Sequence, residues 1–142
     1  MIKSFRGRLV DGDVQTIRLS TNDGLTGYKI LKFQLISNAP GSSSEEDLMK
    51  VYSVDPGTVD NLVDFNDPTL MAVNYNAINA SGWYISEITI FDNKVVNQDI
   101  FVAHKKASAG SSSCNYYLEL EQVKLDLGEA TVATLKDMRG RE

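Results

Sequence analysis

Two residues of this chain are of types that often act as nucleophile or general base, and they lie close together in the sequence. His104 is the only histidine and ends the segment "FDNKVVNQDIFVAH", and Cys114, the only cysteine, opens "CNYYLELEQ". A zinc site needs about four Cys, His or carboxylate ligands, and no basic residue adjoins Cys114 to activate its thiol. We therefore expect both residues to be structural, with His104 on the same strand face as Ile100 and Val102.

Other residue patterns for catalysis or ligand binding are equally weak. The Gly-Ser runs at 41–44 and 110–113 differ from the Gly-x-Ser-x-Gly nucleophile elbow, and the sequence contains no Gly-Lys-Ser/Thr phosphate loop. Two sets of aspartates are spaced to hold calcium but do not fit the EF-hand pattern: Asp60, Asp64 and Asp67, and Asp11 with Asp13. We predict a protein that is not an enzyme, with no catalytic residue, no cofactor and no metal.

Charge is unevenly spread along the chain. The net charge is −5, which argues against nucleic acid as a partner, because phosphate binding needs a basic face. Residues 1–32 hold six basic and three acidic residues, whereas residues 38–101 hold ten acidic residues against Lys50 and Lys94. The pattern is typical either of a self-complementary assembly or of a solvated acidic surface.

The length of 142 residues predicts one domain, over 1–142. An unpaired cysteine indicates folding in a reducing compartment. The start "MIKSFRGRLVDGD" lacks the apolar stretch of about seven residues that a signal peptide needs, and no run approaches the roughly 18 apolar residues of a membrane span. We expect a cytosolic protein without a membrane partner.

Strand patterns dominate the sequence. Short β-rich runs separated by turns predict an all-β fold, an antiparallel sandwich or jelly roll. We expect a hairpin around Asp11-Gly12, one strand face carrying Leu31, Phe33 and Leu35, and a helical turn within "TVDNLVDFNDP". The runs 83–91 and 95–104 should be antiparallel neighbours joined by a turn at 92–94.

The C-terminal third carries two further signals. Tyr116, Leu118 and Leu120 share one parity, while Val123, Leu125 and Leu127 share the other, which predicts a β-bulge near Glu121-Gln122. Val132, Leu135 and Met138 are spaced as the apolar face of a short C-terminal helical turn.

Aromatic and charged residues are the candidates for an interface. The pairs Trp83-Tyr84 and Tyr116-Tyr117 fall in strands, so one member of each pair must face away from the core. Exposed aromatics are typical of interfaces. We add a basic face with Lys3, Arg6 and Arg8 and an acidic one with Glu45, Glu46 and Asp47.

The segments "FDNKVVNQDIFVAH" and "CNYYLELEQVKLDLGEATVATLKDMR" resemble small virion structural proteins of marine tailed bacteriophages of the cyanophage-like group. The opening "IKSFRGRLVDGDVQTIRLSTNDGLTGYKI" is similar to them too, and the resemblance covers most of the chain except 39–80. The resemblance implies a non-enzymatic part of a capsid or tail, often a decoration or cement protein on the head, and it carries over no functional residues.

Three functions follow as expectations. The first is a capsid decoration protein that self-associates, as a trimer, and binds the major capsid protein or other virion proteins after assembly in the host cytoplasm. The second is a tail or head–tail connector component. The third, from a different class, is a carbohydrate- or host-surface-binding β-module that stacks sugars on exposed aromatics. A concave, solvent-facing aromatic patch would favour the third, and aromatics buried between chains would favour the first.

Overall fold

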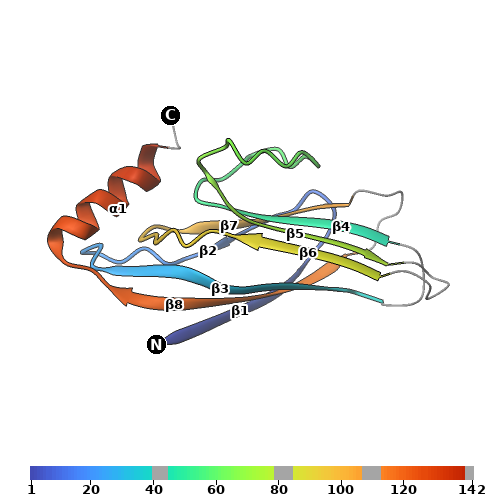
Figure 1. Cartoon of the computed structure of the whole chain (residues 1–142), viewed down its shortest axis with the longest axis horizontal. Coiled ribbons are helices and arrows are strands. Elements are labelled where there is room, and N and C mark those ends of the chain that lie inside the picture. The colour runs from blue at the N-terminus through green and yellow to red at the C-terminus, as the bar shows by residue number, and fades with distance from the viewer. Residues whose placement is uncertain (40–44, 79–84, 107–112, 140–142) are drawn as a thin grey trace.

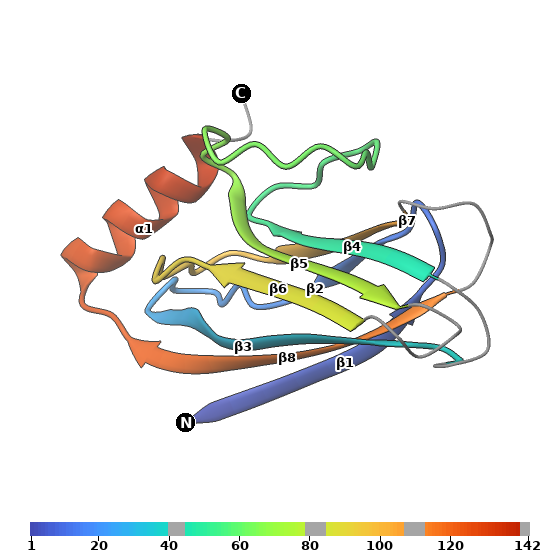
Figure 2. The same ribbon diagram turned by 45° about the vertical axis from the view of Figure 1, so that its right-hand side comes forward.

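The computed structural model describes residues 1–39, 45–78, 85–106 and 113–139, which form two antiparallel sheets and one helix. Sheet A has the order β1 (Ile2–Leu9), β8 (Cys114–Lys124), β3 (Thr26–Ser37). Sheet B has the order β2 (Val14–Ile17), β7 (Ile100–Lys106), β4 (Glu45–Tyr52), β5 (Leu70–Ile78), β6 (Ile85–Phe91). The sheets pack face to face (Figures 1 and 2), which confirms the predicted β-sandwich.

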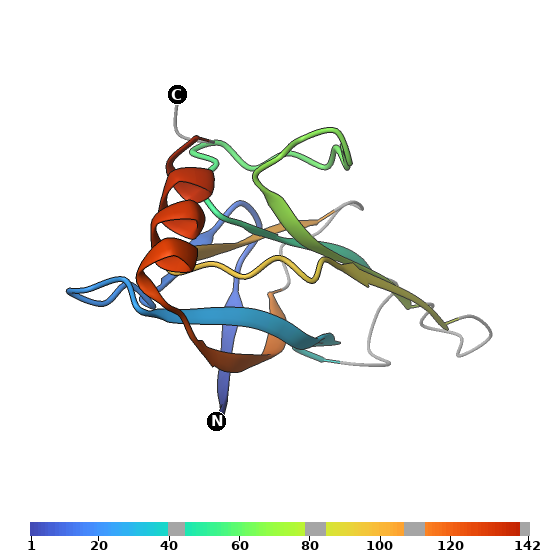
Figure 3. The same cartoon turned by 60° about the vertical axis from the view of Figure 1, so that its left-hand side comes forward.

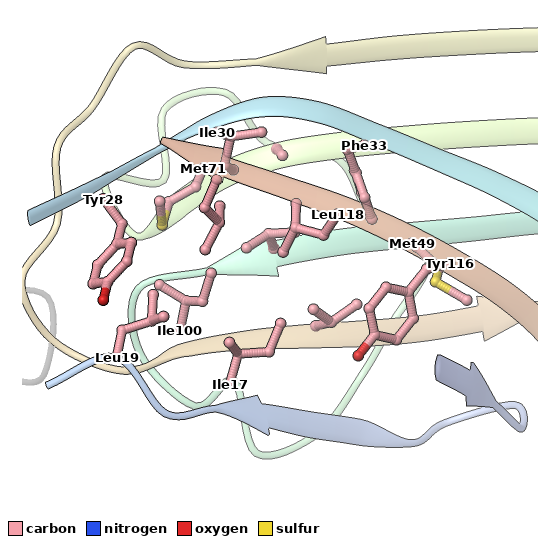
Figure 4. Close-up of a cluster of buried hydrophobic side chains, with 14 of the residues drawn as sticks. Ile17, Leu19, Tyr28, Ile30, Phe33, Met49, Met71, Ile100, Tyr116 and Leu118 are labelled. Atoms are coloured by element: carbon pink, nitrogen blue, oxygen red, sulfur yellow. The ribbon is translucent and has the colours of Figure 1, made fainter. Parts of the chain in front are cut away.

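The main core lies between the sheets and is filled by strand residues of alternating parity. Sheet A contributes Phe33, Tyr116 and Leu118, and sheet B contributes Met49 and Ile100, all almost without solvent exposure. Figure 4 shows these side chains pointing into the space between the two layers. Apolar side chains on one face of each strand are what drives two sheets to pack.

The chain changes sheets at the Asp11-Gly12 turn. A tight turn forms as predicted, with Gly12 at a φ of 86°. The expected hairpin pairing is wrong, because β1 pairs with β8 and β2 pairs with β7. The backbone of His104 in β7 explains the change: its C=O accepts from the Gly12 N–H at 2.9 Å, and its N–H donates to Asp13 C=O at 3.0 Å.

The predicted pairing of residues 83–91 with 95–104 is also wrong. β6 pairs with β5, and β7 pairs with β2 and β4. The connection 92–99 crosses instead to β3, where Val96 and Tyr28 exchange two backbone hydrogen bonds of 2.9 and 2.8 Å. The Asn97 side chain extends this crossing by donating to Gly24 C=O at 3.0 Å.

A β-bulge occurs, but on a different strand from the one predicted. The register between β3 and β8 shifts at Ile30/Lys32, so the irregularity is on β3 rather than at Glu121-Gln122. The extra residue, Leu31, turns outward and is 37% exposed. The expectation that Leu31 shares a face with Phe33 is therefore wrong. The parity change in β8 reflects a second cluster, in which Val123 and Leu125 pack under the helix.

The helix α1 (Leu127–Arg139) lies across one end of the sandwich (Figure 3). It begins after Asp126, whose carboxylate accepts from the Glu129 N–H at 2.8 Å, as N-cap residues do. Ala130 and Ala133 face the sheets, whereas Val132 and Leu135 are exposed. The prediction that Val132 and Leu135 form the buried face is therefore wrong. The helix packs through Ala130 and Ala133 instead, whose small side chains let it approach the sheets closely. The side chain of Met138 lies outside the described residues.

Residues 53–69 form a long connection that covers part of the outer face of sheet B, where Val59 packs against a cluster including Leu48, Tyr52 and Val73. This connection contains no helix, so the predicted helical turn is wrong. Its aspartates each accept a backbone N–H two residues ahead, at Gly57, Leu62, Asn66 and Thr69. Such Asx turns compete with helix formation. Within the described residues, no helix has the length and apolar character needed to cross a membrane.

Candidate interaction surfaces

His104 lies in the interior on the inner face of sheet B, as its parity with Ile100 and Val102 predicts. Its side chain is 0% exposed, and its Nε2 lies 2.9 Å from Oδ1 of Asp47. Asp47 is 2% exposed, so the prediction that it belongs to an acidic surface is wrong. Glu46 is half-buried and accepts a hydrogen bond from the Tyr75 hydroxyl at 2.9 Å. The side chain of Glu45 lies outside the described residues.

Cys114 is the first residue of β8, and its side chain belongs to the main core. It is 0% exposed, and its Sγ lies 3.6 Å from the Ile36 carbonyl oxygen. In the part of the chain that the structure describes, no group of three or more His, Cys, Asp or Glu side chains is arranged to hold a metal ion.

The two tyrosines of β8 face opposite sides of sheet A, as their adjacency predicts. Tyr116 is buried, so its assignment to an interface is wrong, and its hydroxyl donates to Gln15 Oε1 at 2.8 Å. Burial raises the pKa of the Tyr116 hydroxyl. Tyr117 is 37% exposed on the outer face. Trp83 and Tyr84 lie outside the described residues.

Tyr117 lies at the centre of a basic surface on sheet A, which we term the arginine face. Across the strands, Arg6 and Gln34 flank Tyr117, and Arg8 and Ile36 flank Asn115. These six residues border a hollow of about 720 Å³. Arg6 and Arg8 share one side of β1, since they are two residues apart. Lys3, an odd number of residues away on β1, points to the other side of the strand. Its Nζ lies 5.7 Å from the centre of the Tyr28 ring, so Lys3 is not part of the arginine face.

The arginine face carries more positive than negative charge: Arg6 and Arg8 border its hollow, and one carboxylate, that of Glu87, lines the hollow as well. On the same outer side of sheet A, Lys29 pairs with Glu121 at 3.4 Å and Lys32 pairs with Glu119 at 3.6 Å. Among the described residues, neither arginine forms an ion pair, and Arg8 donates only to the neutral Asn38 side chain at 3.3 Å. Guanidinium groups beside an exposed aromatic are suited to binding carboxylates.

A second surface, which we term the apolar patch, lies on the outer side of sheet B and was not anticipated from the sequence. Four large apolar side chains make it up: Val63 (43% exposed), Phe65 (67%), Ile88 (54%) and Ile90 (50%). All four border one hollow of about 350 Å³ between the 53–69 connection and strands β5 and β6. The sequence feature that corresponds to this patch is the segment "LVDF" in an aspartate-rich stretch. The same pattern is equally typical of a helical turn, so it did not predict an exposed patch.

The connection that presents the apolar patch is held from below by a buried lysine. Lys50 is 1% exposed, and its Nζ donates to Asp60 Oδ1 at 3.1 Å and to the Leu62 carbonyl at 2.7 Å. Its ammonium group also lies 5.4 Å from the centre of the Tyr52 ring. The hydrogen bond from Lys50 lowers the pKa of Asp60. The exposed Leu62 is thus fixed at its backbone while its side chain remains in solvent.

Acidic residues lie beside the apolar patch, since Asp67 and Asp92 line a neighbouring hollow together with Phe65 and Ile90 of the patch. The segment 53–69 contains Asp55, Asp60, Asp64 and Asp67 and no lysine or arginine. The two surfaces therefore differ in sign, with arginines on the outer side of sheet A and carboxylates on the outer side of sheet B. The charge asymmetry seen in the sequence becomes an asymmetry between opposite sides of the sandwich.

Comparison with known proteins adds little to this picture. No protein family and no curated protein matches the sequence. Among solved structures, the chain is similar to one from disulfide-linked pili of Bacillus endospore appendages, with 8% identity, coverage of 88% of this chain and 89% of that chain, and a TM-score of 0.36. Similarity at this level carries no argument about function.

Proposed function

We propose that the protein is a non-enzymatic structural subunit of a virion, which self-associates and binds the assembled shell as a decoration protein. The observation that carries the proposal is the apolar patch. Four large, exposed apolar side chains gathered on one side of a folded domain are typical of a protein–protein contact. The buried contacts of Lys50 hold this surface in one conformation, which lowers the entropic cost of association.

The virion setting comes from the resemblance of the sequence to virion structural proteins of marine tailed bacteriophages. A decoration protein must recognise a shell that exists only after assembly. Contacts that are weak singly and linked through self-association meet this need, because linkage can raise overall affinity roughly 10²–10⁴-fold. In this role, the partners are the major capsid protein and other copies of the chain.

A carbohydrate-binding module is the second candidate, and Tyr117 is the observation that favours it. The ring is exposed in a hollow bordered by the amides of Gln34 and Asn115. An exposed aromatic ring with neighbouring amides is an arrangement that binds sugars. The two candidates make different demands on Tyr117, which must stay open to solvent in a sugar-binding module.

The proposed function is tested by sedimentation velocity across a range of protein concentrations, followed by cryo-electron microscopy of particles with the protein bound. We expect concentration-dependent oligomers in which Phe65→Ser weakens association and Leu127→Ser does not. Leu127 is a matched control because it is 76% exposed but lies at the start of α1. The proposal would be overturned if the protein stays monomeric at every concentration and does not bind to particles. If its density lies on the tail rather than on the shell, the protein is a tail or head–tail connector component.

A further inference from the structure

We propose that the apolar patch binds the arginine face of a second copy of this chain, so that copies associate head to tail. The inference rests on the proposed self-association and specifies its partner and geometry. Three features of the described residues carry it: the charge around the patch, the room for patch side chains in the arginine face, and the placement of the two surfaces on opposite sides of the sandwich.

The charge around the apolar patch disfavours contact between two identical patches. In such a contact, the aspartates of one 53–69 segment would meet those of the other, and juxtaposed like charges across an interface are costly. The 53–69 segment holds no lysine or arginine, and Lys50, which contacts it, already binds Asp60 from within the domain. The occupant of the patch must therefore bring positive charge. The arginine face does so, since Arg6 and Arg8 form no ion pairs among the described residues.

The arginine face has room for side chains of the apolar patch. Val63 and Phe65 of the patch are 43% and 67% exposed. The hollow of about 720 Å³ on sheet A is large enough to receive such side chains, and Leu35 and Ile36 are among the residues that line it. Asp64 lies between these two patch residues in the sequence. Its carboxylate would then meet the guanidinium groups at the border of the hollow, in the geometry that arginine favours.

The two surfaces lie on opposite sides of the molecule. In Figure 1, the green 53–69 connection runs above sheet B, while β1 and β8 of sheet A form the opposite layer. A heterologous contact closes into a ring only if each copy is rotated enough relative to the last. Surfaces on opposite sides favour an open chain of copies, so this geometry replaces the trimer expected from the sequence.

The experiment uses two variants of the full chain, each lacking one of the two surfaces. The patch variant carries Val63→Ser and Phe65→Ser, and the face variant carries Arg6→Glu and Arg8→Glu. Each variant alone should associate at least roughly tenfold more weakly than the native chain, as loss of central interface residues does. A 1:1 mixture should form heterodimers and nothing larger, because only one pair of intact surfaces remains. Sedimentation velocity measures all three samples.

Control variants and alternative outcomes distinguish this inference from the proposed function. Arg18→Glu with Lys124→Glu makes the same change of charge away from both surfaces and should associate like the native chain. If the patch variant is monomeric while the face variant still associates, self-association stands and the head-to-tail geometry is wrong. Two monomeric variants whose mixture stays monomeric would also overturn the inference. If the native chain is monomeric at every concentration, the proposed function itself fails.

A folding check keeps the test decisive. Circular dichroism of each variant must match the native chain, and the single variants Phe65→Ser and Arg6→Gln replace any double variant that does not fold. Lower salt should strengthen the mixed contact, because screening of partly exposed charges weakens as the Debye length grows.

Discussion

The pairing of His104 with Asp47 determines how the one histidine of the chain contributes to this fold. Both side chains are nearly without solvent exposure, and their facing atoms are 2.9 Å apart. A buried pair of this kind adds little net stability, but removal of one partner leaves the other buried without compensation. His104 is therefore structural, and its replacement has a cost that the sequence alone did not indicate.

We predict that His104→Leu lowers the free energy of unfolding by about 1–3 kcal/mol or more, because the buried Asp47 carboxylate loses its hydrogen-bond partner. The double variant His104→Leu with Asp47→Leu should recover part of this loss, because no buried carboxylate then remains. Urea unfolding at neutral pH measures both variants. Lys105→Leu, at the next position of β7 but on its outer side, is the control. Equal stability of the single variant and the native chain would show that the pair is unimportant.

Single residues also show where sequence reasoning stops. Adjacency in a strand predicts that Tyr116 and Tyr117 point to opposite sides, but which of them is buried depends on which face of sheet A meets sheet B. Asp47 looks like part of an exposed acidic run, and only its position opposite β7 places it beside His104. Parity is a local property, whereas burial depends on the partner of each strand.

At the scale of elements, the 53–69 connection behaves as a fixed part of the outer surface because Lys50 holds it. Its aspartates satisfy backbone N–H groups within the connection, and the lysine binds the Leu62 carbonyl from below. Few apolar side chains of the segment are buried, so much of its order depends on this one contact.

We predict that Lys50→Met releases the 53–69 connection. The variant keeps the apolar stem of the side chain but loses hydrogen bonds made by a charged donor, which contribute about 1.5–3 kcal/mol. Limited proteolysis should cut between 53 and 69 faster than in the native chain, and self-association should weaken as well. Lys32→Met, which removes a surface cation paired with Glu119 at 3.6 Å, serves as the comparison. Unchanged cleavage in Lys50→Met would contradict the anchoring role.

The elements themselves were largely predictable, whereas their pairing was not. Alternating apolar residues and turn signals located most strands, the Asp11-Gly12 turn and the C-terminal helix. A turn signal says that the chain reverses, but not that the flanking strands pair with each other. After Gly12 and after Phe91 the chain crosses to a different partner, held by His104 in one case and by Tyr28 in the other. These long-range contacts leave no local pattern.

For the whole molecule, hydrogen bonding of aspartates makes stability depend on pH. The pKa of Asp99 is lowered: its partial burial alone would raise it, but hydrogen bonds from Ser20 and Leu19 and the nearby Arg18 outweigh that effect. The pKa of Asp11 is lowered chiefly by the Lys106 N–H, and that of Asp60 chiefly by Lys50. A carboxylate with a lowered pKa contributes stability that is complete above its usual value, near 3.8, and lost as the pH falls through the folded value.

We therefore predict a lower urea midpoint at about pH 3 than at about pH 7. Asp99→Asn should reduce the difference between the two midpoints, because the amide retains some hydrogen bonding but does not titrate. Unfolding curves of the native chain and the variant at both pH values measure this. A variant with the full acid dependence of the native chain would rule Asp99 out as a source of it.

The position of β8 between β1 and β3 has a consequence for the chain as it is being synthesised. Both outer strands of sheet A are made early, yet apart from the single bridge of Tyr28 to Val96 each pairs with residues 114–124. While the ribosome is still translating, β1 and β3 expose apolar sides that have no sheet to join. Pairings between such distant segments form slowly, and the waiting strands are exposed to aggregation. The last of the described strands to emerge therefore completes this layer, so sheet A can form only after residue 124 has been made.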